Sequence, residues 1–268
     1  MTEIFGYVAS VLIGISLGLI GSGGSILTVP VLVYLFSVDA VAATAYSLFI
    51  VGLTAAVGSY KYFTKGLVNI KTAIVFGIPS IIAVFLTRAY IVPAIPKEVF
   101  HAGDFVVTKS VLLLLLFAAL MIVSAYSMIR PDKSKGSIEE VATEQKFNYP
   151  VILIEGLIVG MVTGLVGAGG GFLIIPALVL LSKLPMKEAI GTSLVIIAAK
   201  SLLGFLGESS ETVMDWMTMG KVSLFAIAGI FIGTYLSKKI DGKKLKPIFG
   251  WFVLIMGIYI IIKETLLS

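Results

Sequence analysis

The chain has 268 residues, of which 58% are apolar and only 13% are charged, against about 45–50% and 25% in soluble proteins. A soluble fold of this length needs more polar residues to cover its surface, so this composition excludes a soluble globular protein and a disordered chain. The net charge of +5 does not indicate a nucleic-acid-binding protein, because the basic residues lie in short loops between apolar runs.

Ten apolar segments follow one another along the chain and predict helices. Because Glu3 and no basic cluster precede the first, we expect it to remain in the mature protein. A single polar stretch, 130–148, separates two groups of five and predicts a surface linker. The predicted organisation is therefore a first membrane repeat over 1–129, a linker over 130–148 and a second repeat over 149–268. The segments cover about 4–20, 25–37, 40–60, 68–92, 107–129, 150–166, 171–182, 187–206, 219–238 and 247–262.

Two segments are too short to cross a membrane. The segment 25–37 has about 13 residues and spans roughly 20 Å as a helix, against about 30 Å for the bilayer core. It follows the first segment after GSGGS, and 171–182 follows its predecessor after GAGGG in the same way. Two interpretations stay open: short tilted helices, or hairpins that enter the membrane and turn back. Both place the glycine loops at depth in the membrane.

The two halves repeat each other. A shift of 146 residues places Gly18–Phe36 on Gly164–Ser182 with ten of 19 positions identical, and it places Ser47 on Ser193. Five elements per half is an odd number, so the second half is inserted upside down. The sequence therefore predicts an all-α polytopic membrane protein, an inverted repeat of two five-element halves, each with a broken or re-entrant first helix pair.

Basic residues predict the orientation of the chain. Fourteen of the twenty lie in loops on one side, within 61–71, 130–146, 183–187 and 238–246, and five (Arg88 among them) lie on the other. The positive-inside rule makes the first side cytoplasmic. We expect an inner-membrane protein whose two termini and His101 lie outside.

The glycine loops predict an anion site near the middle of the membrane. Each loop opens a short helix, whose free N–H groups and dipole favour an anion that glycine lets approach closely. Broken helices of inverted repeats form transporter sites in this way. The alternative is close helix packing through small residues. The candidate binding residues are Gly21, Ser22, Gly23, Gly24 and Ser25 in the first loop, and Gly167, Ala168, Gly169, Gly170 and Gly171 in the second.

Polar side chains within the apolar segments extend this site. Ser47, Thr192 and Ser193 are candidate hydrogen-bond donors to the anion, although such hydroxyls also bond to the carbonyl one turn earlier in their own helix. Lys200 is predicted to face the anion, since an ionisable residue inside a span usually lines a cavity or pairs. The alternatives are that it snorkels to the interface or pairs with Glu208.

Three sequence motifs carry a family resemblance. GLIGSGGSILTVP, GLVGAGGGFLIIP and IGTSLVI resemble the TauE/SafE family of membrane permeases over nearly the whole chain. The resemblance implies transport of small sulfur-containing anions such as sulfite, sulfoacetate and other organosulfonates. Ser22 and Ser25 stand opposite Ala168 and Gly171, and this asymmetry leaves the ligand open.

The sequence predicts a secondary transporter that works by alternating access. Its partners are a small anion, the lipid bilayer and a coupling ion, either a proton or sodium. A passive anion channel and an intramembrane enzyme are the alternatives. The absence of cysteine and the presence of one histidine argue against a metal site or a cofactor. The sequence contains no nucleotide-binding loop of the GxxxxGK[ST] type, so it does not support transport driven by ATP.

Overall fold

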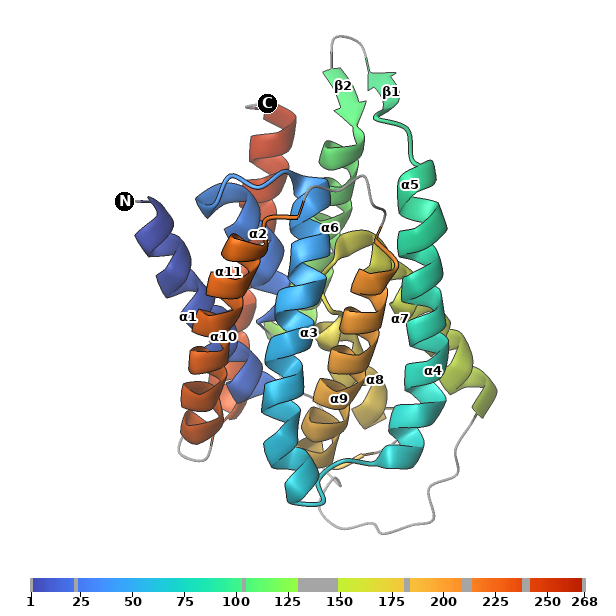
Figure 1. The fold of residues 1–268 in the computed structure, drawn as a ribbon, viewed down its shortest axis with the longest axis vertical. Helices are drawn as coiled ribbons and strands as arrows, with labels where there is room; N and C mark the ends of the chain where they lie inside the picture. Colours follow the sequence, from blue (N-terminus) through green and yellow to red (C-terminus); the bar gives the residue numbers. More distant parts are fainter. Residues whose placement is uncertain are drawn as a thin grey trace.

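The computed structural model describes residues 2–21, 24–102, 105–129, 149–180, 184–208, 214–237 and 242–266. These residues form a helical bundle with a two-stranded hairpin at one end, beside which both termini lie (Figure 1). In chain order the elements are α1 (Thr2–Ile20), α2 (Ser25–Leu35), α3 (Ala40–Thr64), α4 (Ile70–Leu86), the π-helical turn η1 (Thr87–Ile91), α5 (Val92–Ala94), β1 (Glu98–Ala102), β2 (Phe105–Thr108), α6 (Lys109–Ile129), α7 (Tyr149–Val166), α8 (Gly171–Leu180), α9 (Met186–Leu206), α10 (Trp216–Leu236) and α11 (Gly242–Leu266).

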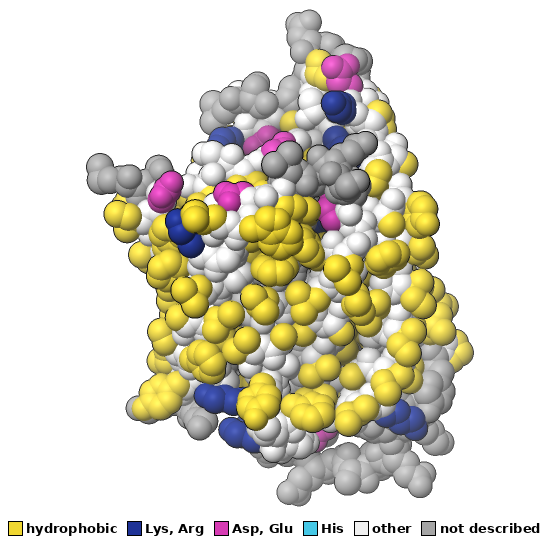
Figure 2. Space-filling model, viewed as in Figure 1, with side chains coloured by type: hydrophobic (Ala, Val, Ile, Leu, Met, Phe, Trp, Pro, Cys, Tyr) yellow, Lys and Arg dark blue, Asp and Glu magenta, His cyan; other side chains and the backbone are white. Residues whose placement is uncertain are grey.

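Six stretches of helix are long and apolar enough to cross a membrane. Charged side chains gather toward the two ends of the bundle and apolar side chains cover the surface between them (Figure 2). The predicted all-α polytopic membrane fold is confirmed at this level. The six are Glu3–Ile20, Ala40–Thr64, Ile70–Ala94, Lys109–Tyr126, Met186–Leu206 and Trp216–Leu236.

Helices α1 and α2 form a hairpin. Phe36, directly after α2, returns to the start of α1: its ring centroid lies 5.3 Å from that of Tyr7. A Cβ atom on Gly6 would lie 2.6 Å from the same ring. The first glycine loop therefore lies at the turn of this helical hairpin.

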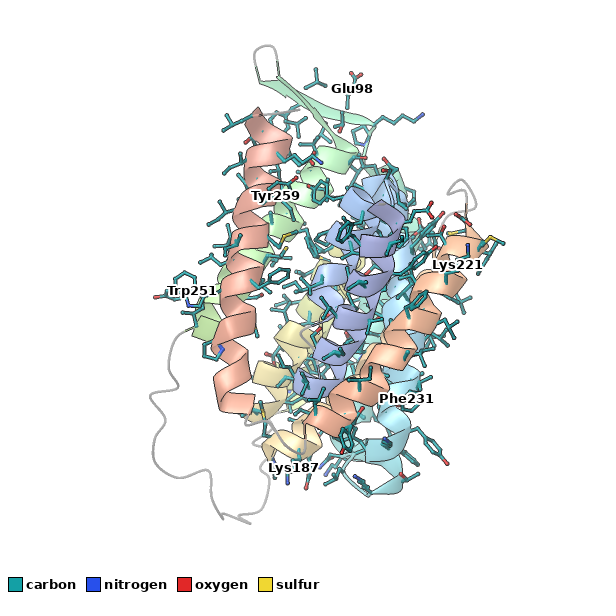
Figure 3. All side chains as sticks on the ribbon, turned by 90° about the vertical axis from the view of Figure 1, so that its left-hand side faces the viewer. Glu98, Lys187, Lys221, Phe231, Trp251 and Tyr259 are labelled. Carbon is teal, nitrogen blue, oxygen red and sulfur yellow. The ribbon has the colours of Figure 1, made fainter. Side chains whose placement is uncertain are left out.

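Helices α7 and α8 form the corresponding pair in the second half. The turn after α8 has the Leu184 N–H to Leu178 carbonyl bond of 3.1 Å, which matches the Val38 to Leu32 bond of 3.0 Å after α2. Helix α9 then begins at the end of the bundle at which α7 begins (Figure 1). Figure 3 shows Lys187 of α9 at this end and Glu98 of β1 at the opposite one.

Glycines let two helix pairs from different halves pack closely. A Cβ atom on Gly14 of α1 would lie 1.9 Å from the Ala226 carbonyl oxygen of α10. One on Gly160 of α7 would lie 2.4 Å from the Ser80 carbonyl oxygen of α4. Helix packing in membranes depends on such close backbone approach, because lipid supplies no hydrophobic driving force between helices.

Helices α3 and α9 form the centre of the bundle. Their spans are 67% and 61% buried, against 33–44% for the other four. Gly52 of α3 meets Leu202 near the end of α9, whereas Gly191 near the start of α9 meets Tyr62 near the end of α3, so the two run antiparallel. Both glycine loops contact this central pair.

The short hairpin of β1 and β2 was not predicted. It is antiparallel, and His101 pairs with Val106 in its ladder. The apolar run Phe105–Thr108 resembles the start of the following span, so hydropathy alone does not separate this strand from α6.

Candidate functional site

The second glycine loop, Gly167–Gly170, joins α7 to α8 inside the bundle. All four residues are buried. The φ angles of Gly167, Gly169 and Gly170 are +72°, +62° and +68°, a region that glycine adopts without steric cost. The sequence of this loop therefore fixes a backbone turn that side chains would strain.

The two central helices contact this loop. A Cβ atom on Gly167 would lie 2.3 Å from the Thr44 carbonyl oxygen of α3, and one on Gly169 would lie 2.7 Å from Val51 of the same helix. From α9, the Ser201 Oγ atom lies 3.4 Å from that second position. The loop thus lies against the first half of α3 and the second half of α9.

Lys200 brings a charge to the loop. Its side chain is fully buried, and its Nζ atom donates a hydrogen bond of 3.1 Å to Thr163 Oγ1 of α7. A Cβ atom on Gly170 would lie only 2.7 Å from Nζ, so the ammonium group touches the loop. Lys200 therefore lies beside the second glycine loop, and its predicted contact with an anion stays a prediction.

Two alternative interpretations of Lys200 are wrong. It does not snorkel, because its ammonium group points into the bundle at Gly170. It does not pair with Glu208, because that carboxylate accepts from Arg88 at 3.1 Å, the one ion pair found among the described residues. The hydrogen-bond partner found for Lys200 in the described part of the chain is the neutral Thr163 hydroxyl.

The predicted hydroxyl groups divide into two kinds. Ser47 Oγ is buried and has no partner among the described residues; it lies on α3 between Thr44 and Val51, which both contact the loop. Ser193 Oγ instead donates to the Ile190 carbonyl of its own helix at 2.9 Å. Ser201, which the sequence analysis did not select, is also buried without a partner in the described ranges.

Thr192 supports a connection between helices. Its hydroxyl oxygen accepts the backbone N–H of Asn69, which lies directly before α4, at 2.9 Å. Asn69 in turn accepts the Thr72 N–H and caps α4. This hydroxyl therefore holds the start of α4 against α9.

The first glycine loop has different surroundings. Gly21, with φ of +76°, lies against Ile190 of α9, and Gly24 lies against the Ile13 carbonyl and Leu17 of α1. Ser25 is fully buried at the start of α2. Two further predicted residues, Ser22 and Gly23, lie outside the described residues, as does the linker 130–148.

The charge at the second loop has no counterpart at the first. By the 146-residue shift, Lys200, Thr163 and Ser201 correspond to Thr54, Leu17 and Ala55. The Thr54 hydroxyl donates to the Ile50 carbonyl of its own helix. Beside the described part of the first loop lies the Ser16 hydroxyl, 2.7 Å from a Cβ position on Gly24, and it donates to the Ile13 carbonyl.

Arg88 corrects the sequence analysis, which placed it in an outer loop. It lies in η1, its side chain is fully buried, and Nη1 donates to Glu208 Oε2. π-helical turns within α-helices are frequent at functional sites. Arg88 falls inside the predicted apolar segment 68–92, and this was the signal that could have identified it, as it identified Lys200.

Comparisons with known proteins agree with this architecture. The family model described as Sulfite exporter TauE/SafE matches residues 7–260. A probable membrane transporter protein of Xylella fastidiosa is 29% identical over 93% of this chain and 91% of its own length. Probable membrane transporter proteins of Methanocaldococcus jannaschii and Bacillus subtilis are each 25% identical, over 94% and 83% of this chain and 94% and 85% of their own lengths. No solved structure matches the chain significantly.

The fold and these relatives define a multi-pass membrane transporter. The chain belongs to the TauE/SafE sulfite exporter family.

Proposed function

We propose that the protein is a secondary transporter for a small sulfur-containing oxyanion: sulfite, sulfoacetate or another organosulfonate. The observation that carries this proposal is the fully buried ammonium group of Lys200, which touches the second glycine loop and bonds to a neutral hydroxyl. The family description supports sulfite or a related anion as the transported species.

The energetics of burial favour an anion at this position. An ammonium group removed from water is costly unless an opposite charge or several hydrogen bonds compensate it. The N-terminus of α8, which begins at Gly171, adds a partial positive charge and free N–H groups at the same place. The hydroxyls of Ser47 and Ser201 provide neutral donors, which bind an oxyanion without trapping it. The Thr163 hydroxyl instead donates to the Gly160 carbonyl and accepts from Lys200.

The first loop completes the site from the other half in this proposal. Residues Gly21–Ser25 provide the N-terminus of α2 near the middle of the membrane, and Thr192 and Ser193 lie on α9 beyond Ile190, which contacts Gly21. The strongest anion contacts belong to the second loop, since the first has Thr54 where the second has Lys200.

Exchanged packing between the halves supports an inverted repeat. Helix α1 of the first half packs on α10 of the second, and its counterpart α7 packs on α4 of the first. Gly21 contacts Ile190 and Gly167 contacts Thr44, two contacts that the 146-residue shift superimposes. We infer that the repeats 1–129 and 149–268, joined by 130–148, rock against each other to give alternating access.

The remaining features of the proposal concern the cell. The protein lies in the inner membrane with both termini outside, and a proton or sodium gradient drives transport. Accumulation of the anion against its own gradient in proteoliposomes distinguishes this transporter from a passive anion channel.

The test measures sulfite affinity and melting temperature on the same preparation of Lys200→Met. If Lys200 binds the anion, affinity falls by about 1.5–3 kcal/mol, the range for a hydrogen bond to a charged group. Lys187→Met, an exposed lysine at the start of the same helix, is the matched control and keeps the wild-type affinity. An unchanged affinity beside a lower melting temperature for Lys200→Met would leave Lys200 a structural residue.

A further inference from the structure

We propose that Arg88 forms a second oxyanion site, toward the end of the bundle that carries the β1–β2 hairpin. At this site two oxygens of the anion accept hydrogen bonds from the Nε–H and Nη2–H groups of Arg88, while Nη1 donates to the carboxylate of Glu208. The proposal rests on the anion transport proposed above and adds a second position on the route.

The donors that Arg88 leaves unused lie on one edge of its guanidinium group. Nη1 donates a hydrogen bond of 3.1 Å to Glu208 Oε2, whereas Nε and Nη2 are buried without a hydrogen-bond partner among the described residues. Nη2 is the terminal nitrogen trans to Cδ, so its N–H lies parallel to the Nε–H. Two parallel donors on one edge are the arrangement that binds two oxygens of a carboxylate, phosphate or sulfonate at once.

Burial makes these two donors significant. The Arg88 side chain has no exposed surface, and Glu208 is 5% exposed. A buried donor without a partner costs free energy, and more so when the group is charged. An oxyanion on the free edge satisfies both donors, and the single bond from Glu208 keeps the guanidinium oriented while partly neutralising it, so the anion can leave again.

Arg88 and Lys200 flank the same contact between α7 and η1. Thr163, the hydrogen-bond partner of Lys200, directly precedes Gly164. A Cβ atom on Gly164 would lie 2.8 Å from Thr87 Cβ, and Thr87 directly precedes Arg88. Beyond Lys200, α9 continues toward Glu208, which meets Arg88. An anion leaving the second loop toward this end of the bundle therefore meets Arg88 next.

This arrangement selects the chemistry of the ligand. An anion with two oxygens on one face, such as sulfite or a sulfonate, engages both free donors. Chloride, a single atom, cannot bridge them in the same way. A lysine at position 88 would keep the charge and lose the paired donors, because its ammonium group acts as a point charge.

The experiment compares two variants with the wild-type protein in proteoliposomes, using sulfite and chloride as probes. Arg88→Lys keeps the positive charge and removes the paired Nε–H and Nη2–H donors. The double variant Arg88→Met/Glu208→Leu removes the pair together, which avoids an unpaired buried carboxylate; such apolar replacements are often neutral or stabilising. We expect both to lower kcat/KM for sulfite at least about tenfold. Sulfite binding at Lys200 persists in the double variant and is lost only on adding Lys200→Met.

A structural ion pair gives the opposite result. If Arg88→Lys and the double variant transport sulfite at the wild-type rate, the proposal is overturned and the pair only holds α4 against α9. Should the double variant fail to fold, Arg88→Lys decides by itself. A wild-type protein that binds neither sulfite nor sulfoacetate overturns the proposed function and this site together, whereas transport that is normal in the wild type and in both variants overturns this site alone.

Discussion

Glycine is required at position 170 for two separate reasons. Its φ of +68° costs other residues about 1–2 kcal/mol, and a Cβ atom there would lie 2.0 Å from Thr163 Cγ2 and 2.7 Å from Lys200 Nζ. The second reason concerns the two partners of the hydrogen bond that positions the ammonium group. The backbone of this loop and the charge beside it therefore depend on each other.

Gly170→Ala is expected to lower the melting temperature and weaken sulfite binding together, because the added methyl group displaces Thr163 and Lys200. Gly220→Ala is the control: this glycine of α10 has no atom within 4 Å of a Cβ position, and alanine favours a helix by about 1 kcal/mol over glycine. Thermal melts with and without sulfite measure both effects. A ligand-induced shift as large in Gly170→Ala as in the wild type would contradict the prediction.

Ser47 and Ser193 are equivalent by the repeat but different in their bonds, which allows a paired test. Ser47 Oγ is buried without a partner among the described residues, whereas Ser193 Oγ bonds to its own helix. If the anion binds at the second loop, Ser47→Ala weakens sulfite binding by about 0.5–1.5 kcal/mol and Ser193→Ala changes it much less. Equal losses in titrations of the two variants would instead indicate a symmetric site between both loops.

Single residues show what the sequence could reveal of the site. Lys200 was predictable because a lone lysine in an apolar span must face a partner. Its actual partner, Thr163, was not, because it lies 37 residues away and its hydroxyl carries no pattern in the sequence. Arg88 was counted with the outer basic residues because it lies near the end of the segment 68–92, although η1 continues α4 as helix through this position.

At the scale of elements, apolar length predicted the helices well. Each of the ten predicted segments contains a helix, although 107–129 begins in strand β2. Hydropathy did not show that α2 folds back along α1; the contact of Phe36 with Tyr7 shows this. The N-caps of α3, α4 and α10 are single polar residues, Asp39, Asn69 and Asp215, which carry no wider pattern in the sequence.

Asp215, the N-cap of α10, gives an element-level prediction with a pH dependence. Its carboxylate accepts hydrogen bonds from the side chain and backbone of Thr218 and from the Met217 N–H, and these lower the pKa of Asp215 below its ordinary value. A lowered pKa means that the cap stabilises the fold above the ordinary pKa and is lost as the pH falls through the folded one.

Asp215→Ala should therefore melt at a lower temperature than the wild type at pH 7. The difference should begin to shrink as the pH falls below about 4, the ordinary pKa of an Asp, and should be lost as the pH passes the lowered pKa of the folded protein. Melting curves of both proteins from pH 7 to pH 3 measure this. A difference that stays constant into the acid range would mean that the carboxylate charge plays no part in the cap.

At the scale of the whole molecule, the repeat was visible in the sequence and its packing was not. The identity of ten positions in 19 predicts two similar halves. Helix α1 packs on α10 and α7 packs on α4 because Gly14, Gly160 and neighbouring small residues let the backbones approach closely. Small residues occur on several helices, so the sequence does not show which two helices will pair. The pairing is decided only in the assembled bundle.

The orientation of the bundle in the membrane is the last prediction, and the chain is well suited to it because it contains no cysteine. Glu98 and Lys187 are exposed and lie at opposite ends (Figure 3). Since Arg88 is buried, the loops predicted to lie outside keep four basic residues of the original five, against fourteen on the other side, and the positive-inside rule favours the same orientation more strongly.

In intact bacterial cells, a membrane-impermeant maleimide should label Glu98→Cys but not Lys187→Cys, which should react only after the membrane is opened. A cysteine at Lys135, in the linker, should behave like the one at position 187. Labelling of Lys187→Cys alone from outside would reverse the orientation, and labelling of Lys135→Cys together with Glu98→Cys would contradict the inverted insertion of the second half.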